Sequence, residues 1–253
     1  VGHRVLPLPS EDGKLTAEQI KAEWIKYDTD PSREHWAQPK MVYISQPTEI
    51  GSMYSKKELQ DLYVGCKEAG LYLFIDGARL GYVLGAPAND MTPADLAANC
   101  DVFYIGGTKV GALFGEAVVI MNPALKKDFR FMMKQRGGML AKGRLLGIQF
   151  DALFTDDLYF RISRHADEMA YQIRDIFVSA GYPLLFDSPT NQQYPIMPDE
   201  ELAILGKNFG YEYWERTDPT HSGVRFCASW ATTQEQVDAF LAALDRLSPS
   251  GQF

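Results

Sequence analysis

Short apolar runs alternate with helical patterns over the first 130 residues of the chain. We predict strands at residues 5–9, 41–45, 71–76, 101–105 and 117–121. Thr16 and Ser55 have N-cap character, because each is followed three positions later by a residue that completes a capping box. Strands that alternate with helices predict an α/β fold with a mostly parallel sheet. Ligands of such sheets bind beyond the carboxyl ends of the strands, which is where Asp76 and residues 106–109 lie.

From residue 156 onward the pattern changes to helical spacing of apolar positions. This predicts a long amphipathic helix that ends at Gly181. Short strands are predicted at residues 184–186, 193–197, 211–214 and 224–228, with helices beginning near residues 198 and 232. We therefore predict a large domain at residues 1–155 and a small α+β domain at residues 156–253.

Composition narrows the class of ligand. The 253 residues are 46% hydrophobic, enough for a sizeable core, and carry a net charge of −8. That negative charge disfavours partners rich in phosphate, both nucleic acids and anionic membranes, so a small molecule is the expected ligand. No apolar run approaches the roughly 20 residues that span a bilayer. Three widely spaced cysteines indicate neither a disulfide framework nor a metal site, and a reducing cytoplasm is the expected location.

Two charged residues stand at the ends of apolar strands. Lys109 is the only cation between residues 101 and 120, and we expect its position to be largely buried. It is either a lysine whose head group reaches water or one that is paired or used covalently. Asp76 follows Leu73 to Ile75 and precedes Arg79, so it either pairs with Arg79, caps the next segment, or serves chemistry. A lysine, a carboxylate and hydroxyl groups at strand ends form the set that pyridoxal 5′-phosphate (PLP) needs.

The motifs resemble one family in particular. YISQPTE at residues 43–49, DGARL at 76–80, GTK at 107–109, the lysine and GGM at 134–139, and VR with SW at 224–230 occur in its order. The chain resembles the threonine aldolases of the β-eliminating-lyase family, within the aspartate-aminotransferase-like PLP enzymes of fold type I. The resemblance implies a PLP-binding large domain with a mostly parallel sheet and a small C-terminal domain.

The same resemblance implies roles for the cofactor residues. Lys109 would bind PLP covalently and Asp76 would pair with the pyridine nitrogen, so that the ring withdraws electrons. Arg79 would reach either the ring hydroxyl or the substrate carboxylate. Thr108 would offer its hydroxyl to the phosphate.

For the substrate, the resemblance implies that Arg225 binds the α-carboxylate, with Arg79 near it and Lys134 facing the site from the same or a neighbouring subunit. The implied reaction is aldol cleavage of a threonine-like β-hydroxy-α-amino acid to glycine and an aldehyde. β-Elimination, transamination and a noncatalytic role stay open, as does the alternative that Arg225 is a surface arginine paired with Asp218 or Glu215. None of the histidines is a strong candidate for the base.

The resemblance also bears on the extent of the protein and on its assembly. Family members carry, upstream of the matched part, a phosphate-binding loop and a histidine that stacks on the cofactor ring. We therefore expect either that this chain is part of a longer protein or that these groups come from elsewhere. A homodimer or homotetramer is expected, because relatives of this fold place the active site at a subunit interface.

Overall fold

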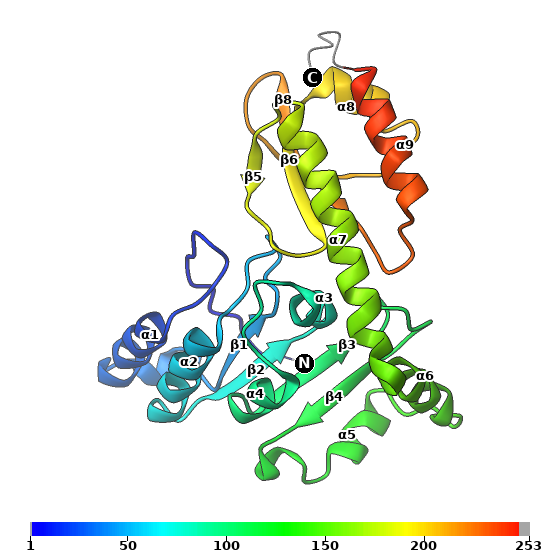
Figure 1. Cartoon of the computed structure of the whole chain (residues 1–253). Coiled ribbons are helices and arrows are strands. Elements are labelled where there is room, and N and C mark those ends of the chain that lie inside the picture. Colours follow the sequence, from blue (N-terminus) through cyan, green and yellow to red (C-terminus); the bar gives the residue numbers. More distant parts are fainter. Residues whose placement is uncertain (1, 248–253) are drawn as a thin grey trace.

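The computed structural model describes residues 2–247, and it contains two sheets joined by one long helix (Figure 1). The first sheet has the order β1-β2-β3-β4. Its strands are Met41–Ser45, Tyr72–Asp76, Val102–Gly106 and Glu116–Ile120. β1, β2 and β3 are parallel and β4 is antiparallel to β3. The predicted α/β class with a mostly parallel sheet is confirmed.

Helices surround this sheet. They are α1 (Ala17–Thr29), a 3-10 turn η1 (Arg33–His35), α2 (Lys56–Glu68), α3 (Leu80–Gly85), α4 (Pro93–Ala98), a turn η2 (Pro123–Leu125), α5 (Phe129–Gln135), α6 (Arg144–Phe154) and a turn η3 (Thr155–Asp157). Both predicted capping boxes, at Thr16 and Ser55, are present. Leu59 and Leu62 of α2 pack with Leu73 and Ile75 of β2 in the main core. This packing fixes the position of the carboxyl end of β2.

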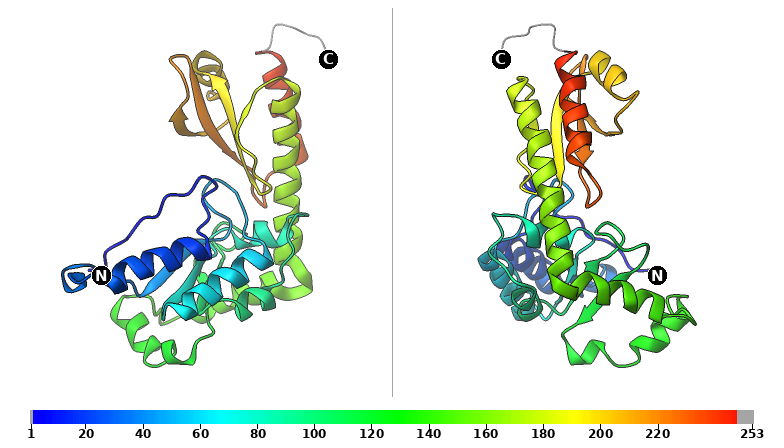
Figure 2. Two further views of the ribbon diagram at one scale, coloured as in Figure 1. Left: turned by 90° about the vertical axis from the view of Figure 1, so that its left-hand side faces the viewer. Right: turned by 45° about the vertical axis from the view of Figure 1, so that its right-hand side comes forward.

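The long helix α7 (Leu158–Ser179) contacts α3 with one part and β6 and α9 with another (Figure 2). The second sheet is antiparallel in the order β5-β6-β8-β7. Its strands are β5 (Leu184–Phe186), β6 (Gln192–Pro198), β7 (Glu212–Arg216) and β8 (His221–Cys227), and its helices are α8 (Asp199–Leu205) and α9 (Gln234–Asp245). Because α7 contacts α3 in the first part of the chain and β6 of the second sheet, the division at residues 155 and 156 stays a prediction.

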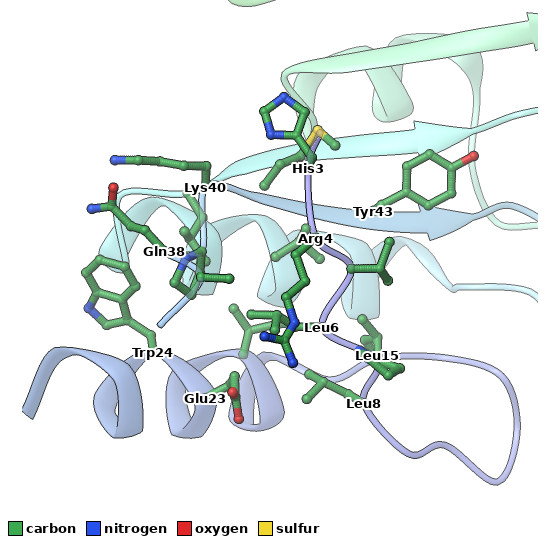
Figure 3. Close-up of a pocket in the computed structure, with 18 of the residues that line it drawn as sticks. His3, Arg4, Leu6, Leu8, Leu15, Glu23, Trp24, Gln38, Lys40 and Tyr43 are labelled. Atoms are coloured by element: carbon green, nitrogen blue, oxygen red, sulfur yellow. The ribbon is translucent and has the colours of Figure 1, made fainter. Parts of the chain in front are cut away.

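The strand predicted at residues 5–9 is wrong. This stretch has no regular secondary structure. Pro7 and Pro9 lack the N–H groups that a sheet ladder needs, which explains why the apolar pattern does not become a strand. The segment instead lines a cavity of about 970 Å³ with residues of α1 and β1 (Figure 3).

In residues 2–247, no helix combines the length and the apolarity needed to cross a membrane.

Candidate active site

The carboxyl ends of β2 and β3 are held together by direct backbone contact. The N–H of Gly106 donates to the carbonyl of Gly77 at 2.8 Å. A Cβ at Gly77 would lie 1.9 Å from the carbonyl oxygen of Tyr104, and one at Gly106 would lie 2.1 Å from that of Ala78. Only glycine fits at such distances, so these two residues bring the turn after Asp76 against the segment that leads to Lys109.

Asp76 lies at the end of β2 and accepts three hydrogen bonds. The hydroxyls of Tyr43 and Tyr104 donate to its two carboxylate oxygens, and the N–H of Ala78 donates at 3.0 Å. Burial by itself raises the pKa of Asp76, but these bonds and the charge of Lys109 outweigh it and hold the pKa below its ordinary value. Asp76 is therefore an anion at neutral pH.

The two tyrosines were not predicted as site residues, although the strand pattern contains the signal. Tyr43 precedes Ser45, the register partner of Asp76, by two positions. Tyr104 follows the paired segment of β3 at the level of Asp76. Side chains two positions apart point to the same face of a sheet, so knowledge of the register would have placed both hydroxyls beside the carboxylate. Burial and the neighbouring Asp76 raise the pKa of both phenols, which keeps them protonated as donors.

Lys109 is exposed, so the expectation of a largely buried lysine is wrong. Its turn leaves the sheet after β3, where Gly107 and Gly111 allow the chain to bend outward. The hydroxyl of Tyr82 donates to the backbone carbonyl of Lys109 and holds the turn in place. The ammonium still acts on Asp76, since its charge contributes to the lowered pKa of that carboxyl. An accessible amine and an ionised carboxylate thus share one edge of the sheet.

Arg79 does not pair with Asp76. Its Nη1 lies 3.4 Å from Oε1 of Glu49, in the loop that follows β1. Of the two structural alternatives for Asp76, the local cap is present, as the bond from Ala78, and the ion pair with Arg79 is not. The side chain of Arg79 is 14% exposed, so its guanidinium is largely buried beside the loop that carries Glu49.

Arg225 on β8 comes from the second sheet and reaches the same loop. Its Nη1 lies 3.0 Å from Oε1 of Gln192 and 3.4 Å from Oε2 of Glu49. Its Nη2 donates to Glu212, and its guanidinium lies 5.7 Å from the ring centre of Trp214. The alternative of a surface arginine paired with Asp218 or Glu215 is not what the structure contains: the Arg225 side chain is 11% exposed, and its acidic partners are others.

The remaining predicted site residues are less tightly placed. Thr108 is exposed beside Lys109. The N–H of the neighbouring Gly107 donates to the carboxylate of Glu116 at 2.8 Å, so this N–H is already used within the protein. Lys134 lies on α5, which in Figure 1 is beyond the edge strand β4. Within residues 2–247, no hydrogen bond or ion pair joins Lys134 to Asp76.

Three of the four histidines lie on elements or make contacts away from Asp76 and Lys109. His165 contacts the carbonyl of Thr232 at 2.7 Å, and His221 pairs with Asp218 at 3.0 Å. His35 lies in a 3-10 turn. That none of the histidines is a strong candidate for the base stays a prediction.

Comparison with known proteins identifies the family. Residues 2–228 match the family described as beta-eliminating lyases, a stretch that contains Asp76, Lys109 and Arg225. The chain belongs to this family. A low specificity L-threonine aldolase of Pseudomonas sp. is 34% identical over 242 residues, which cover 93% of this chain and 66% of that relative. The chain thus spans just under two thirds of the length of this curated family member.

Solved structures agree with the family. A threonine aldolase of Leishmania major superposes with a TM-score of 0.93 at 42% identity, covering 98% of this chain and 71% of the other. A serine palmitoyltransferase of S. paucimobilis, solved with bound PLP–myriocin, gives a TM-score of 0.60 at 14% identity, covering 91% of this chain and 58% of the other. The second likeness shows the fold alone, and that fold is the one of the fold type I PLP enzymes.

Proposed function

We propose that this chain carries the lysine, carboxylate and arginine side chains of a PLP-dependent lyase that cleaves threonine-like β-hydroxy-α-amino acids to glycine and an aldehyde. The observation that carries the proposal is the meeting of an ionised Asp76 and an accessible Lys109 at adjacent strand ends, with Arg79 and Arg225 at the same edge. The relatives named as threonine aldolases support the substrate class.

The residues present fit PLP. A carboxylate has about four acceptor positions, so Asp76 can bind a ring N–H in addition to its three present donors, two tyrosines and the N–H of Ala78. The amine of Lys109 is accessible to a carbonyl group. The glycine contacts of Gly77 and Gly106 hold these two groups at adjoining ends of the strands. The exposed hydroxyl of Thr108 is proposed as a donor to the phosphate.

When bound, PLP supplies an electron sink for the pair released on cleavage of the Cα–Cβ bond. Asp76, held ionised by its donors, keeps a proton on the ring nitrogen. Lys109 provides the amine that holds the cofactor and that can carry a proton after substrate has displaced it. Arg79 and Arg225 bind the α-carboxylate and fix the bond that faces the ring.

The reaction is tested by incubating the full-length protein and PLP with L-threonine and with L-allo-threonine, and measuring glycine and acetaldehyde. We expect equal molar amounts of both products. Release of ammonia and a keto acid instead would show elimination, and formation of an amino acid from an added keto acid would show transamination. Either result would contradict the proposal.

Replacement of Arg225 by alanine is expected to raise the KM for both amino acids strongly and to change PLP affinity less. A buried charge-assisted contact contributes roughly 2–5 kcal/mol, whereas an exposed ion pair contributes under about 1 kcal/mol. The 11% exposure of this side chain favours the larger value. Steady-state kinetics measure the effect, with Arg174→Ala on α7, whose guanidinium pairs with Asp175, as control. An unchanged KM for both substrates would remove Arg225 from the site.

We further propose that the protein is a homodimer or homotetramer. Large apolar side chains are exposed between residues 113 and 148, among them Leu113 at 86% and Phe131 at 74%. Such a patch is typical of a protein–protein interface. Lys134 belongs to the same region, so the proposed contact of Lys134 with a cofactor would be made across the interface.

We expect light scattering at micromolar concentration to show a dimer or tetramer, and Phe131→Glu to dissociate it. A buried glutamate without a partner disfavours association. Val178→Glu, at an exposed position on α7, serves as control and should leave the assembly intact. A monomeric wild-type protein would contradict this prediction.

A cytoplasmic location is likewise proposed. Cys66 and Cys100 are buried free thiols and Cys227 is an exposed one, which suits a reducing compartment.

A further inference from the structure

One carboxylate, that of Glu49, lies between the two arginines proposed to bind substrate. Its Oε1 is 3.4 Å from Nη1 of Arg79, and its Oε2 is 3.4 Å from Nη1 of Arg225. Each oxygen of one carboxylate thus meets a different guanidinium. An amino-acid carboxylate held by these arginines would make the same pair of contacts.

The contacts of Glu49 are loose. Strong charge-assisted N–H···O bonds are about 2.7–2.9 Å long, well below the distances found here. The side chain of Glu49 is 65% exposed, against 14% for Arg79 and 11% for Arg225. The arginines are therefore fixed parts of the site, whereas the carboxylate between them is free to leave toward solvent.

Both arginines have hydrogen-bonding capacity left over. Among the described residues, the guanidinium of Arg79 makes its only hydrogen bond to Glu49. The Nε of Arg225 is buried and has no partner in the same part of the chain. Guanidinium groups carry five donors each, so a better-seated carboxylate would gain contacts that Glu49 does not make.

The backbone of Glu49 is anchored, which limits any movement to its side chain. The hydroxyl of Tyr194 donates to the carbonyl of Glu49. The N–H of Thr48 donates to the carbonyl of Ser52 at 2.9 Å, and a Cβ at Gly51 would lie 2.0 Å from the hydroxyl of Ser188. The loop is thus clamped between the two sheets while the carboxylate projects from it.

We propose that the Glu49 carboxylate is a resident occupant of the substrate-carboxylate position, displaced when an amino acid binds. This inference rests on the proposed function, since it takes Arg79 and Arg225 as the carboxylate site. Glu49 then makes the site selective for ligands that carry a carboxylate. A ligand without a carboxylate cannot replace its two contacts, and a ligand with one binds less tightly than it would at an empty pair of arginines.

The test uses Glu49→Gln in the full-length protein and a probe that cannot be cleaved. 3-Hydroxybutyrate carries a carboxylate and a β-hydroxyl but no α-amino group, so its binding is independent of the reaction. Removal of a competing charge from two weak ion pairs should tighten its Kd by about three- to tenfold in titration calorimetry. The KM for threonine should fall by a similar factor.

Glu215→Gln on β7 is the matched control, because it removes the same charge and makes no ion pair in the described part of the chain. An unchanged Kd for Glu49→Gln, or an equal gain in Glu215→Gln, would overturn the proposal. So would a crystal structure of the wild-type protein with bound 3-hydroxybutyrate in which Glu49 stays on both arginines.

The two proposals fail separately. Tighter binding of 3-hydroxybutyrate by Glu49→Gln, together with no cleavage of threonine by the wild type, would support the role of Glu49 and contradict the lyase reaction. Cleavage of threonine with an unchanged Kd would support the reaction and contradict the role of Glu49.

Discussion

Replacing Lys109 with alanine is expected to abolish covalent attachment of PLP and to lower turnover by roughly 10³-fold or more, because acid–base groups alone contribute about 10²–10⁴-fold. The fold should be unaffected. The side chain is exposed, and the contact that holds its turn is made by the backbone carbonyl, which alanine retains. Borohydride reduction of the wild-type protein followed by mass spectrometry should place a pyridoxyl group on Lys109.

Lys207→Ala provides the control for this experiment, since Lys207 is an exposed lysine that follows α8, outside the site and the proposed interface. It should keep both the adduct and the activity. A pyridoxyl group on Lys134 or Lys142 in the wild-type protein would contradict the assignment of Lys109.

Asp76→Asn is expected to preserve cofactor attachment and to lower kcat by about 10²–10³-fold, in the range found when a group that stabilises developing charge is removed. An amide cannot hold a positive charge on the ring nitrogen. With its oxygen at the place of Oδ1, the amide would still accept from Tyr104 and the Ala78 N–H, and its NH2 group would donate to the Tyr43 hydroxyl, so the geometry should persist while the charge is lost.

The Asp76 variant is measured by steady-state kinetics in the full-length protein and by the absorbance of the bound cofactor. Asp61→Asn on the outer surface of α2 removes an equal charge far from the strand ends and should behave as wild type. Near-normal turnover of Asp76→Asn would show that Asp76 has another role.

Much of the fold could be predicted from local pattern. The strand at residues 41–45 and the capping boxes at Thr16 and Ser55 agree with the structure, because alternation and cap chemistry are properties of neighbouring residues. Short helices such as α3, α5 and α6 were not predicted. α5 has no side-chain cap bond and no buried residue, so its sequence carries little signal.

The site could be predicted only in part. Asp76 and Lys109 stand out because charges are rare at the ends of apolar strands. Glu49 does not stand out, since a glutamate in a polar loop is the usual case. Its position between Arg79 and Arg225 depends on two sheets meeting, and no local pattern records that.

The close packing of α3 on α7 affects the distance between Arg79 and Arg225. A Cβ at Gly81 would lie 2.4 Å from the hydroxyl of Ser163, and one at Gly85 would lie 2.8 Å from the backbone nitrogen of Arg164, so only glycine leaves room at these points for the Ser163 side chain and the backbone of α7. Arg79 immediately precedes α3, and the sheet that carries Arg225 packs on α7. The distance between the two guanidiniums is therefore fixed by the packing of α3 on α7 and of α7 on the sheet that carries Arg225. Residues of the α3–α7 contact, which touch no ligand, thus determine what size of anion Arg79 and Arg225 can bind together.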